Sequence, residues 1–255
     1  MMNILDRTFE HPLKHEETAI IPFMGGIVQY GYQCGMIWGA VLASGAQAYR
    51  LLGPGPQTET RAVQAAKKLI ESFYTCNNNI NCLEITDIDK SSSTLQMIIY
   101  FLFKGGTIGC IRRAMKYGPV AFGDINFTIS AEPDEVPATP VSCTALLAKK
   151  TGASGMHTVM AAGLAGGIGL SGGACGALGA AIWILSMKII REGNGKITFK
   201  NPRILDMIEK FIKCTDYEFE CYAITGRKFK NVSEHAAYIC NGGCEKIINE
   251  LAALC

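Results

Sequence analysis

Charge is scarce and nearly balanced in this chain of 255 residues: Lys and Arg together number 24, Asp and Glu 22, and the formal net charge is +2. Proteins that bind nucleic acid carry a basic patch or a block of Lys and Arg, and no run of five or more basic residues appears here. We therefore expect no nucleic-acid partner. Hydrophobic residues make up 49% of the chain, which favours a globular protein with a large core over a disordered one.

The sequence also lacks a secretory signal, because a basic start followed by an apolar run is absent near Met1. We therefore expect a cytoplasmic protein. In a reducing compartment its 11 cysteines are not expected to form a disulfide framework, so metal binding or thiol redox chemistry is the expected use. The odd number of cysteines also prevents complete pairing within one chain.

Two long stretches without any Asp, Glu, Lys or Arg, residues 18–49 and 151–187, raise the question of a membrane. Each exceeds the roughly 20 residues that a spanning helix needs. The glycine pairs Gly25-Gly26 and Gly166-Gly167 break both stretches into pieces that suit buried core helices better. We expect no membrane span, with a protein of two spans as the alternative.

The segments around these glycine pairs are copies of each other. The first runs from Gly25 to Gly35 and the second from Gly166 to Gly176, with both paired glycines, the following Ile, a later Gly and a final Cys-Gly identical and in register. A Cys-x-x-Ile-Thr motif follows in each half, and then a Gly-Gly pair before a third cysteine. The cysteines that recur in this order are Cys34, Cys82 and Cys110 in the first half and Cys175, Cys221 and Cys244 in the second.

Between the two copies, residues 131–140 contain three prolines and three acidic residues, which is typical of an extended linker. We predict a first repeat over residues 1–132, a linker over 133–140 and a second repeat over 141–255. Two fused copies commonly pack about a pseudo-twofold axis, as a homodimer does. A homodimer of the whole chain stays open.

Helical patterns dominate both halves, and we predict an all-α fold. Apolar residues recur at a spacing of three and four over 60–74, over 204–212 and over 247–254. Asn201-Pro202 is a helix start, and Ser92 is expected to cap a helix that ends at Gly105. The few candidate strands are residues 196–200 and 125–130.

Residues 167–172 spell GxGxxG, the dinucleotide fingerprint, which requires a preceding strand and an acidic residue about 20 positions later. Residues 156–164 are instead typical of a helix, and the next acidic residue is Glu192. We expect the glycines to allow close backbone approach. Their N–H groups and a helix dipole are then expected to lower the pKa of Cys34 and Cys175, which favours a nucleophile or a ligand.

The second repeat resembles the family of redox-active proteins known by the cysteine signature C-GCAxxG-C-C. The resemblance runs through Cys143, the Gly166-Gly167 pair, a central Cys-Gly-Ala-x-Gly motif that begins at Cys175, and then Cys221 and Cys244. It extends in weaker form to the first repeat. A similar domain of split-Soret cytochromes is associated with an iron–sulfur centre. No Cys-x-x-Cys-His motif is present, so covalent haem is not implied.

The resemblance implies a set of four cysteine ligands in the second repeat, which suits a [2Fe–2S] or [4Fe–4S] cluster or, as the alternative, zinc. These four are Cys143, Cys175, Cys221 and Cys244. The first repeat supplies only Cys34, Cys82 and Cys110, and would take water, a substrate, His15 or another residue as the fourth ligand. Cys34 and Cys175 are also the predicted catalytic residues. Each repeated cysteine could instead be a small buried apolar residue.

The leading hypothesis is a redox protein that passes electrons from an iron–sulfur cluster to a redox partner protein or a small-molecule acceptor. A thiol–disulfide oxidoreductase, in which Cys175 and either Cys221 or Cys244 cycle between dithiol and disulfide, is the second hypothesis. A zinc-stabilised structural protein is the third. The remaining cysteines are expected to be incidental, and the basic residues after Cys110 are expected to form a solvated helix face: Cys76, Cys214, Cys240 and Cys255; Arg112, Arg113 and Lys116.

Overall fold

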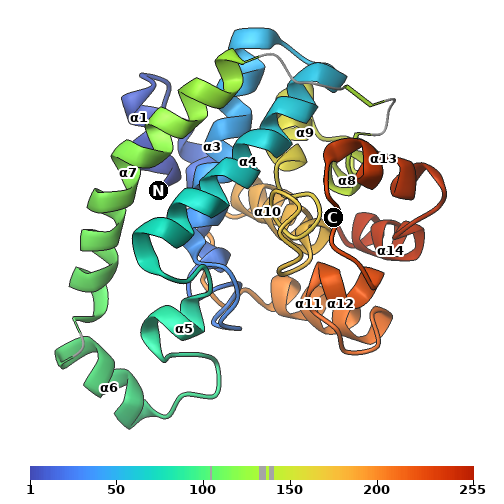
Figure 1. Ribbon diagram of the computed structural model, residues 1–255. Helices are drawn as coiled ribbons and strands as arrows, with labels where there is room; N and C mark the ends of the chain where they lie inside the picture. Colours follow the sequence, from blue (N-terminus) through green and yellow to red (C-terminus); the bar gives the residue numbers. More distant parts are fainter. Residues whose placement is uncertain (104, 132–135, 138–140) are drawn as a thin grey trace.

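The computed structural model describes residues 1–103, 105–131, 136–137 and 141–255, and all the regular elements in these ranges are helical (Figure 1). The all-α prediction is therefore confirmed. The predicted strands are wrong. Residues 196–200 form a turn region, and residues 125–130 are the end of a long helix in which Ile125 and Ile129, four positions apart, are both buried.

Each repeat contributes seven α-helices in the same order. The first repeat contains α1 (Met2–Thr8), α2 (Lys14–Thr18), a short 3-10 turn (Ile21–Phe23), α3 (Gly35–Leu52), α4 (Pro56–Asn77), α5 (Cys82–Thr86), α6 (Thr94–Leu102) and α7 (Gly106–Ser130). The second contains α8 (Cys143–Lys150), α9 (Gly155–Ala162), α10 (Gly176–Glu192), α11 (Pro202–Cys214), α12 (Cys221–Thr225), α13 (Val232–Cys240) and α14 (Glu245–Leu254). The tandem arrangement is thus confirmed. The predicted linker lies mostly outside the described residues and stays a prediction.

Sequence signals account for most of the helix ends. Pro56 begins α4, which contains the predicted helix over 60–74. The Asn201 side chain accepts a hydrogen bond from the Arg203 N–H at 3.0 Å and so caps α11 as predicted. The cap of α6 is Ser93, one residue later than expected. Gly105 adopts a left-handed conformation, but it precedes α7 and does not end α6.

The two repeats pack reciprocally, which is the pseudo-twofold arrangement. Helix α3 of the first repeat lies against α9 of the second, and α10 of the second lies against α2 of the first, which is the counterpart of α9. Within each repeat the counterparts also match, since α1 contacts α3 and α7 just as α8 contacts α10 and α14. In Figure 1, α7 and α14 lie on opposite sides of this central group.

The side chain of Gln33 is a polar link between the repeats. Gln33 is fully buried; its Nε2 donates to the carbonyl oxygen of Gly167 at 3.4 Å, and its Oε1 accepts from the N–H of Ala174 at 3.1 Å. The Tyr32 and Phe219 rings stack beside it, with centroids 4.3 Å apart. Because the amide group is satisfied on both atoms, its burial is compatible with a stable interface.

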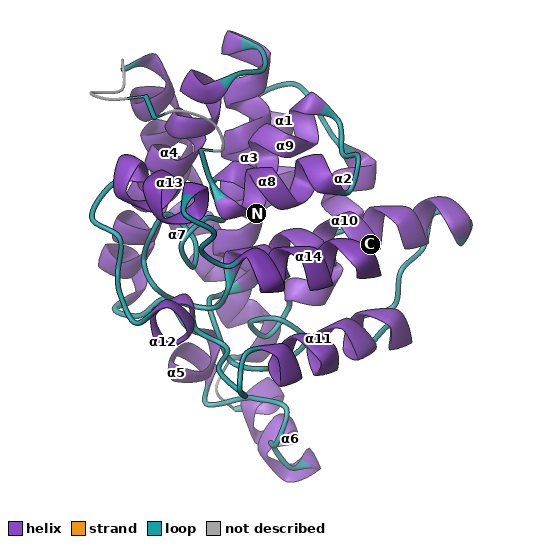
Figure 2. Cartoon of the chain, turned by 90° about the vertical axis from the view of Figure 1, so that its right-hand side faces the viewer, coloured by secondary structure: helices purple, strands orange, loops and turns teal. Residues whose placement is uncertain are grey.

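Helix α6 projects from the body of the molecule in both views (Figures 1 and 2). Its side chains Leu95 and Leu102 are exposed. No single helix in the described part of the chain is long and apolar enough to cross a membrane. Helices α6 and α7 meet that test of length and composition only as a pair bent by 55°.

The crossing of α3 and α9 depends on a glycine, which provides a test of the interface between the repeats. A Cβ atom on Gly45 would lie 2.4 Å from the Cα atom of Met160 on α9. We expect Gly45→Ala to lower the free energy of unfolding by about 1–3 kcal/mol, because the helices must separate to admit the methyl group. Urea unfolding measures this change.

The control is Gly123→Ala in α7, where an added Cβ meets nothing within 4 Å. This variant is expected to leave stability unchanged or to raise it by roughly 0.5–1 kcal/mol, as alanine favours helix. Equal effects of the two substitutions would show that α3 and α9 are not in backbone contact at Gly45.

Candidate functional site

The first two repeated cysteines of each half are held together by a short backbone ladder. Cys34 directly precedes α3, and its N–H donates to the carbonyl oxygen of Ile80 at 2.8 Å, while the N–H of Cys82 donates to the carbonyl oxygen of Tyr32 at 2.8 Å. The second repeat has the same pair of bonds: the N–H of Cys175 donates to the carbonyl oxygen of Phe219 at 2.9 Å, and the N–H of Cys221 donates to that of Gly173 at 2.6 Å. Cysteines 48 and 46 positions apart in sequence thus become neighbours.

A left-handed turn precedes each of these ladders. Five consecutive residues have positive φ in both repeats, over 25–29 and over 166–170. The first run includes the β-branched residues Ile27 and Val28, and a left-handed conformation costs roughly 1–2 kcal/mol for each such L-residue. Matching hydrogen bonds hold both turns, such as the Val28 N–H to Pro22 O at 2.7 Å. The GxGxxG segment forms this turn, without a preceding strand, and so is no dinucleotide site.

The four predicted cysteines of the second repeat lie close enough for three of the thiols to act on the fourth, Cys143. Cys143 begins α8, Cys175 precedes α10, Cys221 begins α12 and Cys244 precedes α14. The first three are buried, and Cys244 is partly exposed. Burial raises the pKa of Cys143 well above its usual value, and the neighbouring thiols Cys244, Cys221 and Cys175 raise it further. The four sulfur atoms therefore share one electrostatic environment.

The predicted lowering of the pKa of Cys34 and Cys175 is wrong. Burial raises the pKa of each thiol to about 12. Backbone N–H groups at the start of each helix act in the predicted direction, from Met36 on Cys34 and from Leu178 on Cys175, but burial outweighs them. The thiols are consequently protonated at neutral pH when no cation accompanies them, and a catalytic role for either stays a prediction.

Two polar partners recur at equivalent places beside the thiols. The hydroxyl of Tyr100 lies 3.7 Å from the Sγ of Cys110, and the hydroxyl of Tyr238 hydrogen-bonds Cys244 and lowers its pKa. A threonine four residues after the second cysteine does the same for Cys82 and Cys221. These threonines are Thr86, with its Oγ1 3.9 Å from the Cys82 Sγ, and Thr225, which lowers the pKa of Cys221.

The two tyrosines are not predictable as site residues from their spacing in the sequence. They lie ten residues before Cys110 and six before Cys244, so no fixed spacing links them to the cysteines. The signal that could have found them is their equivalent place in the two repeats, since Tyr100 and Tyr238 occupy the same position within the corresponding helices α6 and α13. The threonines were visible as part of the repeated Cys-x-x-Ile-Thr motif.

The first site gathers three thiols and a cation. The neighbouring thiols Cys82 and Cys110 both raise the pKa of Cys34, which places the three together. Arg113 acts in the opposite direction on Cys34 and Cys82, so it faces these thiols and does not belong to a purely solvated helix face. That expectation is therefore wrong for Arg113.

A methionine occupies the place of the fourth cysteine. Met2 begins α1 just as Cys143 begins α8, each 33 residues before the glycine that begins the next long helix of its repeat, and Met2 is fully buried. His15 lies on α2, whose counterpart α9 carries none of the second-site cysteines. A ligand role for His15 stays a prediction that the arrangement of the repeats does not favour.

All eleven cysteines are free thiols. Within the described ranges no three His, Cys, Asp or Glu side chains are positioned to hold a metal ion as they stand. The chemistry of the second donor set nevertheless fits a soft metal centre, because its four donors are all sulfur atoms and three of them are buried. The ligand roles of the seven repeated cysteines stay predictions. Cys240 is exposed, and the Sγ of Cys255 bonds the carbonyl oxygen of Ala181 at 3.6 Å.

The fold and the two thiol sites define a helical protein with duplicated, cysteine-lined centres. The profile of the family described as "Putative redox-active protein (C_GCAxxG_C_C)" matches residues 1–99 and 141–255. The chain belongs to this family and carries two tandem copies of it, which supports a redox role. The first match ends before Cys110. No curated protein and no solved structure matches the chain.

Removing the Tyr238 hydroxyl tests its contact with the second site. We expect Tyr238→Phe to raise the pKa of Cys244, because the hydrogen bond that favours the thiolate is lost. Alkylation of Cys244 in the metal-free chain at pH 9 should then slow by roughly 3–10-fold, the worth of one hydrogen bond. Mass spectrometry after timed iodoacetamide treatment measures the rate. Tyr217→Phe, at a residue that is 77% exposed, is the control, and an equal slowing there would refute the contact.

The raised thiol pKa values also predict a loss of stability at alkaline pH. An unfolded cysteine has a pKa of roughly 8.5, whereas the buried ones lie far above it. The unfolded state therefore releases protons first, and the free energy of unfolding falls as pH rises above the unfolded value, by about 1.4 kcal/mol per pH unit for each buried thiol.

Cys143→Ala isolates one such thiol. In the metal-free chain the decline of stability between pH 9 and 10.5 should become shallower, by about one thiol's contribution of 1.4 kcal/mol per pH unit. The exposed Cys240 gives the control Cys240→Ala, which should keep the original slope. Urea unfolding at a series of pH values measures both, and identical slopes for the two variants would contradict the burial of Cys143.

Proposed function

We propose that this protein is an electron-transfer protein that holds an iron–sulfur cluster in its second repeat and passes electrons to a redox partner protein or a small-molecule acceptor. The observation that supports the proposal is the mutual proximity of four thiols that lie at the starts of four different helices. These are Cys143 from α8, Cys175 before α10, Cys221 from α12 and Cys244 before α14. When bound, the cluster would supply one-electron chemistry that amino-acid side chains lack.

The chemistry of the thiols favours a bound cation. Burial disfavours the thiolate form of all four, and neighbouring thiolates disfavour it further at Cys143, Cys175 and Cys221. A metal centre replaces the thiol protons and compensates the negative charges, so it would relieve both costs at once.

The protein's own polar groups would then set the environment of the sulfur atoms. The N–H groups of Ala177 and Leu178 act on Cys175, Thr225 acts on Cys221 and Tyr238 acts on Cys244. Hydrogen bonds to cysteine sulfur raise the reduction potential of an iron–sulfur centre by stabilising its more negative, reduced form. These residues therefore hold and tune the site, in this proposal, without reacting themselves.

The thiol–disulfide hypothesis is less well supported. The nucleophile in that chemistry is a thiolate, and a thiol whose pKa lies near 12, like that of Cys175, holds almost none at neutral pH. Zinc is the closer competitor, since a closed set of four sulfur donors suits structural zinc as well. A cytoplasmic location and a homodimer stay predictions.

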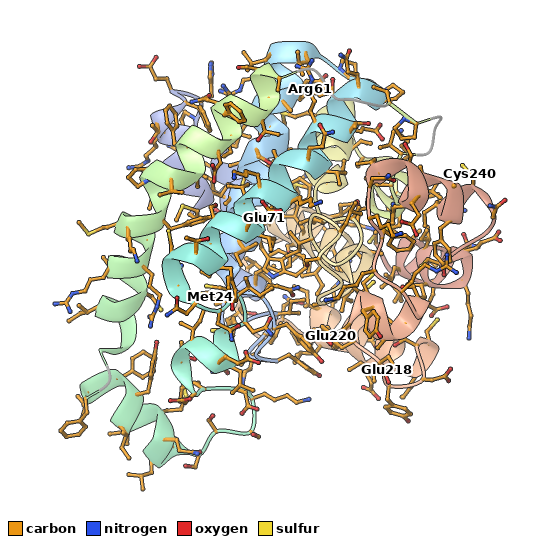
Figure 3. The ribbon with its side chains drawn as sticks, in the orientation of Figure 1. Met24, Arg61, Glu71, Glu218, Glu220 and Cys240 are labelled. Atoms are coloured by element: carbon orange, nitrogen blue, oxygen red, sulfur yellow. The ribbon has the colours of Figure 1, made fainter. Side chains whose placement is uncertain are left out.

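Anaerobic purification of the full chain tests the proposal. We expect a coloured protein with visible absorbance, stoichiometric iron and acid-labile sulfide, and a loss of colour on reduction. Cys143→Ser should lower the iron and sulfide content by at least the second site's share. Cys240→Ser, at an exposed thiol on the periphery (Figure 3), is the matched control and should leave both unchanged.

Other outcomes would refute the cluster. A colourless protein with one zinc ion that Cys143→Ser removes would establish the structural-zinc alternative. A metal-free protein that takes up thiol label at Cys175 and Cys221 only after reduction would establish disulfide chemistry. Equal metal loss in the Cys143 and Cys240 variants would show that the four-thiol site is not the metal site.

A further inference from the structure

A groove lies beside the thiols at the same place in each repeat. The first groove, of about 310 Å³, lies between the end of α4 and the start of α7 and is lined by Cys76, Asn77, Asn78, Arg112, Arg113 and Lys116. The second groove, of about 440 Å³, lies between the end of α11 and the start of α14. Its lining includes Cys214, Asp216, Glu218, Tyr238, Cys244 and Glu245.

The two grooves are structural counterparts. Cys76 lies at the end of α4, and Cys214 at the end of α11, 138 positions later. The same offset relates Tyr100 to Tyr238, the tyrosines of the two thiol sites. Helices α7 and α14, which form the other walls, are likewise counterparts. Differences between the grooves are therefore differences between two copies of one feature.

Their charges are opposite. Arg112, Arg113 and Lys116 line the first groove, and no acidic side chain does. The second groove is lined by three acidic residues and one lysine: Asp216, Glu218, Glu245 and Lys246. Glu218 lies in the segment that leads into α12, on the outer side of the second repeat (Figure 3). An anion is thus favoured in the first groove and repelled by the second.

Each groove adjoins its thiol site. Cys244 itself lines the second groove. In the first groove Arg113 provides the link, because it lines the groove and also lowers the pKa of Cys34 and Cys82. Its Nη2 donates to the carbonyl oxygen of Ile85 at 3.5 Å, within the short helix α5 that begins with Cys82. Lys116 is fixed by a 2.7 Å bond from its Nζ to the carbonyl oxygen of Cys76.

We propose that the first groove is the binding site of a small anionic ligand, a carboxylate or an oxyanion, which three cations hold against the three-thiol site. A guanidinium group binds such anions with two parallel hydrogen bonds, and Arg112 and Arg113 supply two of these groups. The groove is shallow and open to solvent, so it would admit a small ligand that stays partly exposed. The inference goes beyond the proposed cluster, since it concerns the other repeat and requires no metal.

Two alkylating reagents of the same size test the charge of the grooves. Iodoacetate is an anion and iodoacetamide is neutral, so the ratio of their rates at one cysteine cancels the reactivity of that thiol. With the full chain, as purified and again after chelation, we expect the ratio at Cys110 and Cys76 to exceed that at Cys244 by roughly 10-fold at low salt. The difference should shrink at 1 M salt, where screening is short-ranged. Equal ratios at Cys110 and Cys244 would overturn the proposal.

Variants assign the effect to the groove. Arg112→Gln and Arg113→Gln should each lower the iodoacetate preference at Cys110 several-fold. Arg113 also donates a hydrogen bond to the backbone of Ile85, so Arg113→Gln could disturb the local fold. Arg112→Gln removes a charge from the groove without the loss of that bond. The control is Lys210→Gln on α11, whose Nζ pairs with Asp206, and it should leave the ratio unchanged.

Protection of Cys110 by inorganic phosphate distinguishes binding of an anion in the groove from a general electrostatic attraction of anions. At constant ionic strength, phosphate should slow the reaction of iodoacetamide with Cys110 but not with Cys244, and Arg113→Gln should abolish the protection. If chloride at the same ionic strength protects equally, the groove is charged but binds no anion, and the proposal fails. Iron and sulfide analysis reports on the cluster separately, so failure of one idea leaves the other measurable.

Discussion

The site depends on two pairs of backbone hydrogen bonds. The bonds around Cys34 and Cys82, and those around Cys175 and Cys221, join segments that are otherwise far apart in the chain. Each ladder follows a left-handed turn, whose conformational cost must be met by the hydrogen bonds and packing around it. The other two thiol positions of each site lie at helices that pack against α3 in the first repeat and against α10 in the second. The position of all four therefore depends on where the ladder fixes the cysteine that precedes α3 or α10.

The same burial that assembles the thiols makes them poor acids. A helix start and several N–H groups near Cys175 act to stabilise a thiolate, yet desolvation outweighs them. Neutral thiols are tolerated in an apolar core, whereas four thiolates are not, so the second site is stable when protonated or when a cation is bound. This is the physical reason for proposing a metal centre here in preference to free thiol chemistry.

Much of the architecture was predictable from the sequence, because a duplication is visible as identical residues at equivalent positions of the two repeats. The glycine turns, the order of the cysteines and the all-α class followed from such patterns. The correspondence of Met2 with Cys143 did not, since it rests on shared position without shared chemistry. The direction of the pKa shifts and the place of Arg113 also required the structure, because burial and proximity arise from tertiary packing. The strand predicted over residues 125–130 is wrong because apolar residues alternate there as in a strand, although the segment is the last part of the long helix α7.

The Gln33 side chain has a consequence for the symmetry of the molecule. Its amide occupies the space beside Gly173, where even a Cβ atom would lie within 1.4 Å of Nε2, and its counterpart in the second repeat is Ala174. In a dimer of identical subunits both places would carry the same residue. Covalent fusion removes that requirement, so the two halves can diverge residue by residue while keeping a common frame. The molecule therefore has two ends with the same fold but different side chains, so that one end is basic where the other is mostly acidic.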